Sequence, residues 1–245
     1  MPRIHWLFLA TSLLPVCALA EIDCESAVRC NQMGTAAYQA GRYPQAIELF
    51  ERQLRRAEDA DGESRELALN NLILSNLKAG RSGMAGRSGM ARAWLNLALD
   101  EQMQGAATRH NLAKVAAAFD YPAMTRSVEG HYLRYGGQAV WSSLDIRRQA
   151  DGQLRVSFFP LRAGAQVEEY GPAAIGELEG RLQGQGAHYV LQDAGLAARC
   201  SVELLAEGLD IRVLEVFADD DCQQYGGAGI SVAGRYYKVS ATPEQ

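Results

Sequence analysis

The chain has few of the residues that usually mark an active centre. Of its four histidines, His110, His131 and His188 follow the N-terminal segment, and none stands in a spacing such as His-x3-His. A transition-metal site is therefore not predicted. Lysine and arginine total 24 against 29 aspartate and glutamate residues. Because no basic stripe occurs, nucleic acid is not an expected partner.

Long apolar runs are missing after the first twenty residues. Arg3 precedes an apolar run that closes at Ala18-Leu19-Ala20, a small-x-small cleavage site. This run is too short for a good membrane span. We therefore predict a signal peptide over residues 1–20, cleaved after Ala20, and a periplasmic or secreted protein without stable membrane insertion. A lipoprotein signal at Cys17 is the alternative, but Leu14-Pro15-Val16 lacks the small residues it needs.

Cysteines are few, and four remain after the leader: Cys24, Cys30, Cys200 and Cys222. An even number in an exported chain predicts two disulfides, with three possible pairings. Because the cysteines lie in two clusters, we favour Cys24–Cys30 and Cys200–Cys222. Zinc is the alternative, but no Cys-x2-Cys pair and no nearby histidine support a metal site.

Motifs for catalysis and cofactor binding are also missing. Residues 229–233 resemble a nucleophile elbow but lack its final glycine and the following helix. The glycines of 226–229 do not match a phosphate-binding loop. Residues 219–221 are three adjacent aspartates without calcium-loop spacing, which predicts a solvated turn, with weak calcium binding as the alternative. We assign no catalytic residue, cofactor or metal, and expect a protein that is not an enzyme.

What the sequence does contain is a helical first half. From residue 33 to about 120, alanine, leucine, glutamine and arginine dominate, and apolar residues recur at helical spacing. We predict a helical domain over residues 21–126, with residues 106–120 as its last helix. Part of it shows the spacing of a helical repeat, at Gly34, Gly41, Tyr43, Ala46, Phe50 and Leu54.

This spacing resembles the tetratricopeptide repeat, in which two antiparallel helices pack around small residues. The resemblance covers about 70 residues. It lacks the tryptophan-leucine signature and the closing proline of that family. The resemblance implies stacked helical hairpins with a concave surface for a peptide or protein, and hence an adaptor or scaffold role.

A tandem hexapeptide hides the second repeat. Arg-Ser-Gly-Met-Ala-Gly fills 81–86 and recurs from residue 87, where Arg92 replaces the last glycine. Omitting one copy aligns Gly80 with Gly41. The aligned core positions are then Leu72 and Asn76 in the first helix, and Ala91, Leu95, Ala98 and Leu99 in the second. The six extra residues are expected in the turn between helices, as a flexible protrusion.

The second half has the alternation of β-strands. Tyr121-Pro122 ends the helical pattern, and Asp151-Gly152 and Glu207-Gly208 are hairpin turn signals. About eight strands are predicted, at 128–135, 139–148, 153–162, 175–183, 187–192, 198–205, 209–217 and 229–239. The expected fold class is α+β, with an antiparallel β domain over residues 127–245 that forms a barrel or sandwich.

The stretch from Tyr189 to Lys238 also resembles the ending of small periplasmic β-barrels that include the C-type lysozyme inhibitors. That family is eight-stranded, carries a disulfide and inserts a serine–glycine–arginine–tyrosine loop into the lysozyme cleft. The nearest matches here are Ser231, Gly234, Arg235 and Tyr236, although Val232-Ala233 intervene. The resemblance implies that Ser231, Arg235 and Tyr236 bind a partner.

Three functions remain open from the sequence. The leading hypothesis is an exported, non-enzymatic adaptor for a periplasmic protein or peptide. The alternatives are an inhibitor or immunity protein against a lysozyme-like or toxin hydrolase, and a carrier of a small apolar ligand. Trp94 and Trp141 are predicted in the core or at its rim. Four tyrosines are candidates for an exposed interface, at positions Tyr132, Tyr135, Tyr236 and Tyr237.

Overall fold

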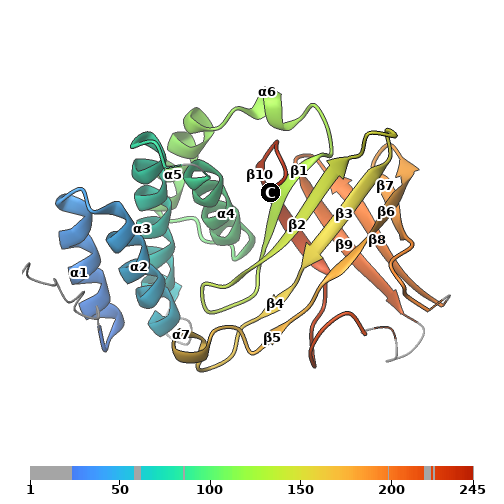
Figure 1. Cartoon of the computed structure of the whole chain (residues 1–245). Helices are drawn as coiled ribbons and strands as arrows, with labels where there is room; N and C mark the ends of the chain where they lie inside the picture. Colours follow the sequence, from blue (N-terminus) through green and yellow to red (C-terminus); the bar gives the residue numbers. More distant parts are fainter. Residues whose placement is uncertain are drawn as a thin grey trace, which may run out of the picture.

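The computed structural model describes residues 24–57, 62–84, 86–197, 199–217, 222 and 224–244. Stacked helices form the first half and a closed β-barrel forms the second, with the two halves side by side (Figure 1). The α+β class predicted from the sequence is confirmed. The predicted signal peptide, the alternative at Cys17 and the aspartates of 219–221 lie outside the described residues.

Five helices build the first half: α1 (Ala27–Gln39), α2 (Tyr43–Ala57), α3 (Gly62–Arg81), α4 (Arg87–Asp100) and α5 (Ala106–Ala118). The first begins where Ser26 Oγ accepts a hydrogen bond from the backbone N–H of Arg29. It ends at the turn that contains Gly41, whose φ of +74° suits glycine. A short helix, α6 (Tyr121–Met124), leads from α5 over to the barrel (Figure 1).

Consecutive helices pack as hairpins around small residues. A methyl group on Gly34 would lie 2.5 Å from Cε1 of Phe50, so α1 approaches α2 closely only because this residue has no side chain. Leu72 and Asn76 of α3, and Leu95 of α4, are buried as the repeat alignment predicts. The alignment also predicted a core position for Leu99, and this prediction is wrong. Leu99 lies near the end of α4 and is 38% exposed.

The hexapeptide copies have different structural roles. The first copy follows on from α3, which continues through Gly80 to Arg81, so Gly80 does not take the turn position of Gly41. Gly83 and Gly86 have positive φ and form the turn instead. The second copy is part of α4, and its Gly89 lies against the backbone carbonyl of Val239 in the barrel.

The barrel is a closed antiparallel meander in the order β1-β10-β9-β8-β7-β6-β3-β2. Its strands are β1 (Gly130–Tyr135), β2 (Trp141–Arg148), β3 (Leu154–Phe159), β6 (Leu178–Gln185), β7 (His188–Gln192), β8 (Cys200–Glu207), β9 (Asp210–Phe217) and β10 (Gly234–Ser240). These match the eight predicted segments, and the barrel alternative is confirmed over the sandwich. Gly152 and Gly208 form predicted turns with positive φ.

Between β3 and β6 the chain leaves the barrel as a two-stranded arm. The arm comprises β4 (Leu161–Arg162), α7 (Val167–Tyr170) and β5 (Ala174–Ile175), with Leu161 paired to Ile175. It reaches beneath the helical half, so that α7 lies at the foot of the helices (Figure 1). The sequence predicted strands at both ends of this segment but no arm.

The barrel interior is packed with the chain's own side chains. Tyr132, Phe158 and Tyr236 are each no more than 1% exposed, and the rings of Phe158 and Tyr236 meet edge to face. The expectation that four tyrosines form an exposed interface is wrong for three of them. Tyr132 and Tyr236 are buried inside the barrel, and Tyr237 is buried beneath α4, at 4% exposure. Trp94 lies in the core as predicted.

Both predicted disulfides are present. Cys24 bonds to Cys30 at the start of α1, and Cys200 bonds to Cys222, which fastens the start of β8 to the connection before β10. Two disulfides fit an oxidising, exported environment. Across the part of the chain that the structure describes, no helix is long and apolar enough to cross a membrane.

Candidate functional site

A groove lies between α1 and α3 in the helical half. Thr35, Tyr38 and Gln39 of α1 form one wall, Asn71 and Leu74 of α3 form the other, and the volume is about 260 Å³. Phe50 and Ser75 close the floor. The walls combine amide and hydroxyl groups with apolar surface, which suits an extended polypeptide that has both backbone polar groups and side chains.

The groove continues along the helices beyond this pocket. Val28 lies two turns before Thr35 on α1, and Leu67 lies two turns before Leu74 on α3, so both occupy the groove face. Their side chains are 68% and 46% exposed, which is unusual for apolar residues on packed helices. The apolar surface of the groove therefore continues toward the starts of α1 and α3, with Thr35 and Asn71 as polar groups along it.

The polar residues of the groove are held in place by hydrogen bonds. Asn71 Nδ2 donates to Oδ1 of Asn31, at 2.8 Å, and to Oε1 of Gln53, at 3.2 Å. These bonds join α1, α2 and α3. Ser75 Oγ is buried on the groove floor and has no hydrogen-bond partner among the described residues.

Tyr38 closes the end of the groove away from Val28. Its ring meets that of Tyr43 edge to face, with centroids 5.6 Å apart. Burial, reinforced by Tyr43, raises the pKa of the Tyr38 hydroxyl, while nearby Arg81 acts in the opposite direction. The hydroxyl therefore stays protonated at neutral pH and can donate a hydrogen bond to a ligand.

A buried ion pair fixes the helical half to the barrel. Arg92 of α4 places its guanidinium 2.8 Å from a carboxylate oxygen of Asp210 on β9, and both residues are buried. The same guanidinium donates to the backbone carbonyl of Lys238 at 2.7 Å. A paired charge in this position restricts how α4 can lie on the barrel, because any shift leaves a charge buried without its partner.

Aromatic rings fill the rest of this interface. Trp94 of α4 meets Trp141 of β2 with ring centroids 4.8 Å apart, and it also contacts Tyr135 of β1. The main apolar cluster of the helices includes Leu133 and Tyr237 from the barrel. The two halves therefore share one hydrophobic core, and the groove is held in a fixed orientation relative to the barrel.

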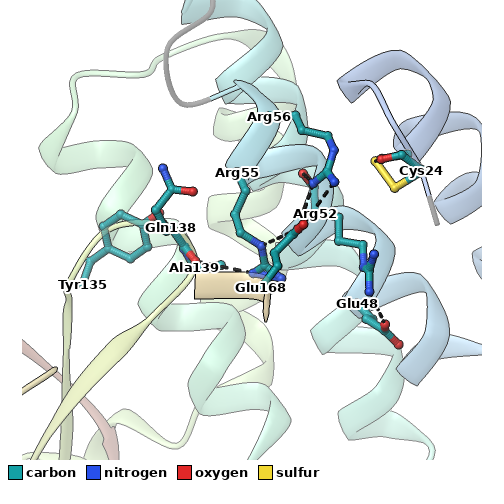
Figure 2. Close-up of polar contacts among 10 residues, drawn as sticks. Cys24, Glu48, Arg52, Arg55, Arg56, Tyr135, Gln138, Ala139 and Glu168 are labelled. Carbon is teal, nitrogen blue, oxygen red and sulfur yellow. Dashed lines mark hydrogen bonds and ion pairs between the residues drawn. A yellow bond between two sulfur atoms is a disulfide. The ribbon is translucent and has the colours of Figure 1, made fainter. Parts of the chain in front are cut away.

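The arm makes a second connection between the halves, shown in Figure 2. Glu168 of α7 accepts hydrogen bonds from Arg55 at 2.9 Å and from Arg56 at 2.8 and 3.0 Å. Arg55 also donates to the carbonyl of Gln138 in the β1–β2 loop. Hydrogen bonds from Arg56, joined by those from Arg55, lower the pKa of Glu168 to about 2. The arm is thus clamped to α2.

Glu51 on α2 has a carboxyl group whose ionised form is disfavoured by burial. Burial raises the pKa of its carboxyl to about 7, although Arg55 and Arg87 act to lower it and Glu48 adds to the rise. No hydrogen bond or ion pair to Glu51 occurs within the residues that the structure describes. At neutral pH this carboxyl is therefore close to its titration midpoint.

The residues taken from the lysozyme-inhibitor resemblance do not form one exposed loop. Tyr236 points into the barrel and is fully buried. Arg235 bridges Asp100 of α4, at 2.9 Å, and Asp210, at 3.2 Å, so it joins the two halves. Ser231 Oγ donates to Glu215 at 3.0 Å. Their binding of a partner stays a prediction, and their contacts in this structure are internal.

No family model matches the chain, and neither a curated protein nor a solved structure shows significant similarity. No group of histidine, cysteine, aspartate and glutamate residues suited to a metal ion occurs in the described ranges.

Most of the groove was not identified from the sequence. Thr35, Asn71 and Leu74 carry no motif, and their relation depends on how α1 and α3 lie across α2. One signal was available: Val28 and Leu67 stand equally far before the aligned glycines Gly41 and Gly80, and both are apolar at helix positions that face solvent.

Proposed function

We propose that this protein is an exported, non-enzymatic adaptor whose helical half binds an extended segment of another exported protein. The observation that carries this function is the α1–α3 groove, in which Thr35, Gln39 and Asn71 lie beside apolar surface that continues to the exposed Val28 and Leu67. Stacked helical hairpins bind in this way because each adds side chains to one continuous surface. The tetratricopeptide-like spacing supports the same function.

An exported setting supports the proposal. The predicted signal peptide of residues 1–20 and the two disulfides both favour the periplasm or a secreted location. The barrel then serves as a rigid support, since its interior is filled and α4 is fastened to its outer face. In this arrangement the partner contacts the helices, and the barrel keeps them in place.

The test is capture of partners from an extract of exported proteins, using the oxidised chain from residue 21 onward as bait. Thr35→Arg would fill the groove, whereas Ala36→Arg adds the same charge and bulk to an exposed neighbouring position of α1. We expect specific proteins to be retained by the wild type and by Ala36→Arg, and to be lost with Thr35→Arg. Equal retention by both variants would remove the groove from the function.

The inhibitor hypothesis makes a different prediction. If the barrel bound a hydrolase through Arg235, then Arg235→Ala would weaken that complex by roughly 2 kcal/mol or more. The internal contacts of Arg235 and the burial of Tyr236 give this alternative less support than the groove gives the adaptor. A hydrolase captured equally well by wild type and Thr35→Arg, but lost with Arg235→Ala, would favour the inhibitor.

A further inference from the structure

One end of the barrel is open, and it contains a cavity that the adaptor function does not use. The β2–β3, β6–β7 and β8–β9 turns at this end contain Gly152, Gly186 and Gly208, each with positive φ and no atom near its missing side chain. A cavity of about 400 Å³ lies there, beneath the segment that leads from α6 into β1.

The walls of this cavity are mixed: polar and charged side chains make up more of its surface than apolar ones, and its apolar part is the half-buried side chains of Leu154 and Leu209, above the buried Tyr132 and Ile211. Tyr132, Leu154, Leu209 and Ile211 contribute side chains from four different strands or turns. A second hollow of about 510 Å³ adjoins it and shares Leu154, Tyr189 and Arg148 with it. A volume of several hundred Å³ is in the range that holds a small organic molecule.

Positively charged side chains without an ion-pair partner are in excess at the mouth of the barrel. Lys238 lies at the base, where its Nζ donates to the carbonyls of Met124, at 2.9 Å, and Ser127, at 2.5 Å, and sits over the ring of Tyr132. It has no carboxylate within ion-pair distance in the described chain. Burial lowers the pKa of Lys238 to about 8, so its amine is still largely charged at neutral pH.

The other charged groups do not cancel Lys238. Arg148 pairs with Glu129 at 2.9 Å. Asp210 is already neutralised by two arginines, Arg92 and Arg235, which reach it from the outer side of the barrel. Arg126 is exposed at the rim and makes no hydrogen bond or ion pair to any residue that the structure describes.

From this arrangement we propose that the mouth of the barrel is a binding site for a small amphiphile with an apolar body and a single anionic head. The apolar body lies against Leu154 and Leu209, the half-buried apolar side chains of the cavity. The head group lies toward Arg126 and Arg148 and within the field of Lys238, where charge-assisted hydrogen bonds form. This site is independent of the helical groove, so failure of either proposal leaves the other standing.

The test uses octanoate as the anionic probe and octanol as its uncharged match, with binding to the oxidised protein measured by isothermal titration calorimetry. We expect octanoate to bind about tenfold or more tightly than octanol. Arg126→Gln should weaken octanoate binding severalfold without altering the fold, because the Arg126 guanidinium makes no hydrogen bond or ion pair within the described residues. Arg42→Gln, which removes an exposed arginine of the helical half, should leave the affinity unchanged.

A variant that fills the mouth supplies a second readout. Leu154→Trp should abolish binding of both probes while the thermal midpoint and circular dichroism show that the barrel is still folded. No octanoate binding by the wild-type protein, equal affinity for octanoate and octanol, or an unchanged affinity in both Arg126→Gln and Leu154→Trp would overturn the proposal.

Discussion

The buried carboxyl of Glu51 should make the stability of the protein depend on pH. Glu51 has a folded-state pKa near 7, well above its ordinary 4.5. A carboxyl with a raised folded pKa stabilises the fold only while it stays protonated, so stability is lost as the pH rises from about 4.5 through 7. The ionised form is unfavourable because burial removes it from water.

Glu51→Gln should therefore stabilise the protein at pH 8 by about 1 to 2 kcal/mol and have little effect near pH 4. Urea unfolding at both pH values measures this difference. Glu48→Gln is the matched control, because Glu48 is on the same helix with a 49% exposed side chain and its weak pair with Arg52 should matter little. A loss of stability in Glu51→Gln at pH 8 would show that the ionised carboxylate is useful to the fold.

Gly89 allows α4 to approach the barrel closely because it has no side chain. A methyl group there would collide with the carbonyl and side chain of Val239. Gly89→Ala should lower the free energy of unfolding by about 1 to 3 kcal/mol, although alanine favours helices. Gly62→Ala adds a methyl group where no atom lies within 4 Å, so it should be neutral or stabilising. Calorimetric midpoints of the two variants test this, and equal midpoints would argue against a close contact.

At the scale of the elements, Glu168 joins the arm to α2. Glu168 has its pKa lowered to about 2, so its contribution is present above pH 4.5 and is lost as the pH falls toward 2. Its side chain is 31% exposed, and solvent therefore weakens the effect. Glu168→Gln should cost about 1 kcal/mol at pH 7.

The clearest readout for Glu168→Gln is hydrogen exchange along the arm and the β1–β2 loop, which should become faster while exchange in α3 stays the same. Glu169→Gln changes the adjacent carboxylate on α7, which does not reach α2 in the described contacts, and should leave exchange unchanged. Equal exchange in both variants would mean that the arm is held by other contacts.

The hairpin between α3 and α4 tests the meaning of the tandem hexapeptide. Deletion of residues 81–86 should preserve the fold, because the second copy supplies the residues that enter α4 and contact the barrel. Since α3 must end about one turn earlier, a loss of about 1 kcal/mol is expected. A fall of many degrees in the thermal midpoint would show that the longer turn, including the buried side of Met84, is needed.

The sequence was most informative where one element determines its own pattern. Alternation at Leu154, Val156 and Phe158 predicted a strand with its buried face, and Asp151-Gly152 predicted the turn before it. The two cysteine pairs were found from their clustering. The arm was missed because its strands have only two residues each, too few to show a period.

Contacts between segments that are far apart in the chain could not be predicted from the sequence. Arg92 and Asp210 pair across the interface, yet each appears in the sequence as an ordinary surface charge. The exposure predicted for the tyrosines of β10 was wrong for a similar reason. Alternation shows which residues share a face of a strand, but it does not show that α4 covers the outer face. Tyr236 and Tyr237 are both buried, one inside the barrel and one beneath the helix.

At the scale of the whole molecule, a shared core should make both halves unfold together. Wild-type protein is expected to lose its helical circular dichroism and its near-ultraviolet tryptophan signal at the same temperature. Arg92→Met leaves Asp210 partly unpaired at the interface and should cost about 3 kcal/mol. Arg29→Met, an exposed change on α1, is the control. Two separate transitions in the wild type would mean that the halves are independent.

We propose that the α1–α3 groove is the surface that binds a partner protein. The most direct measurement places a photo-crosslinking amino acid at Gln39, on the exposed edge of the groove, and at Arg155, on the barrel exterior. After irradiation in an extract of exported proteins, we predict a covalent adduct to a specific polypeptide from position 39 and none from position 155. Adducts from position 155 alone would contradict the adaptor function and move the binding surface to the barrel.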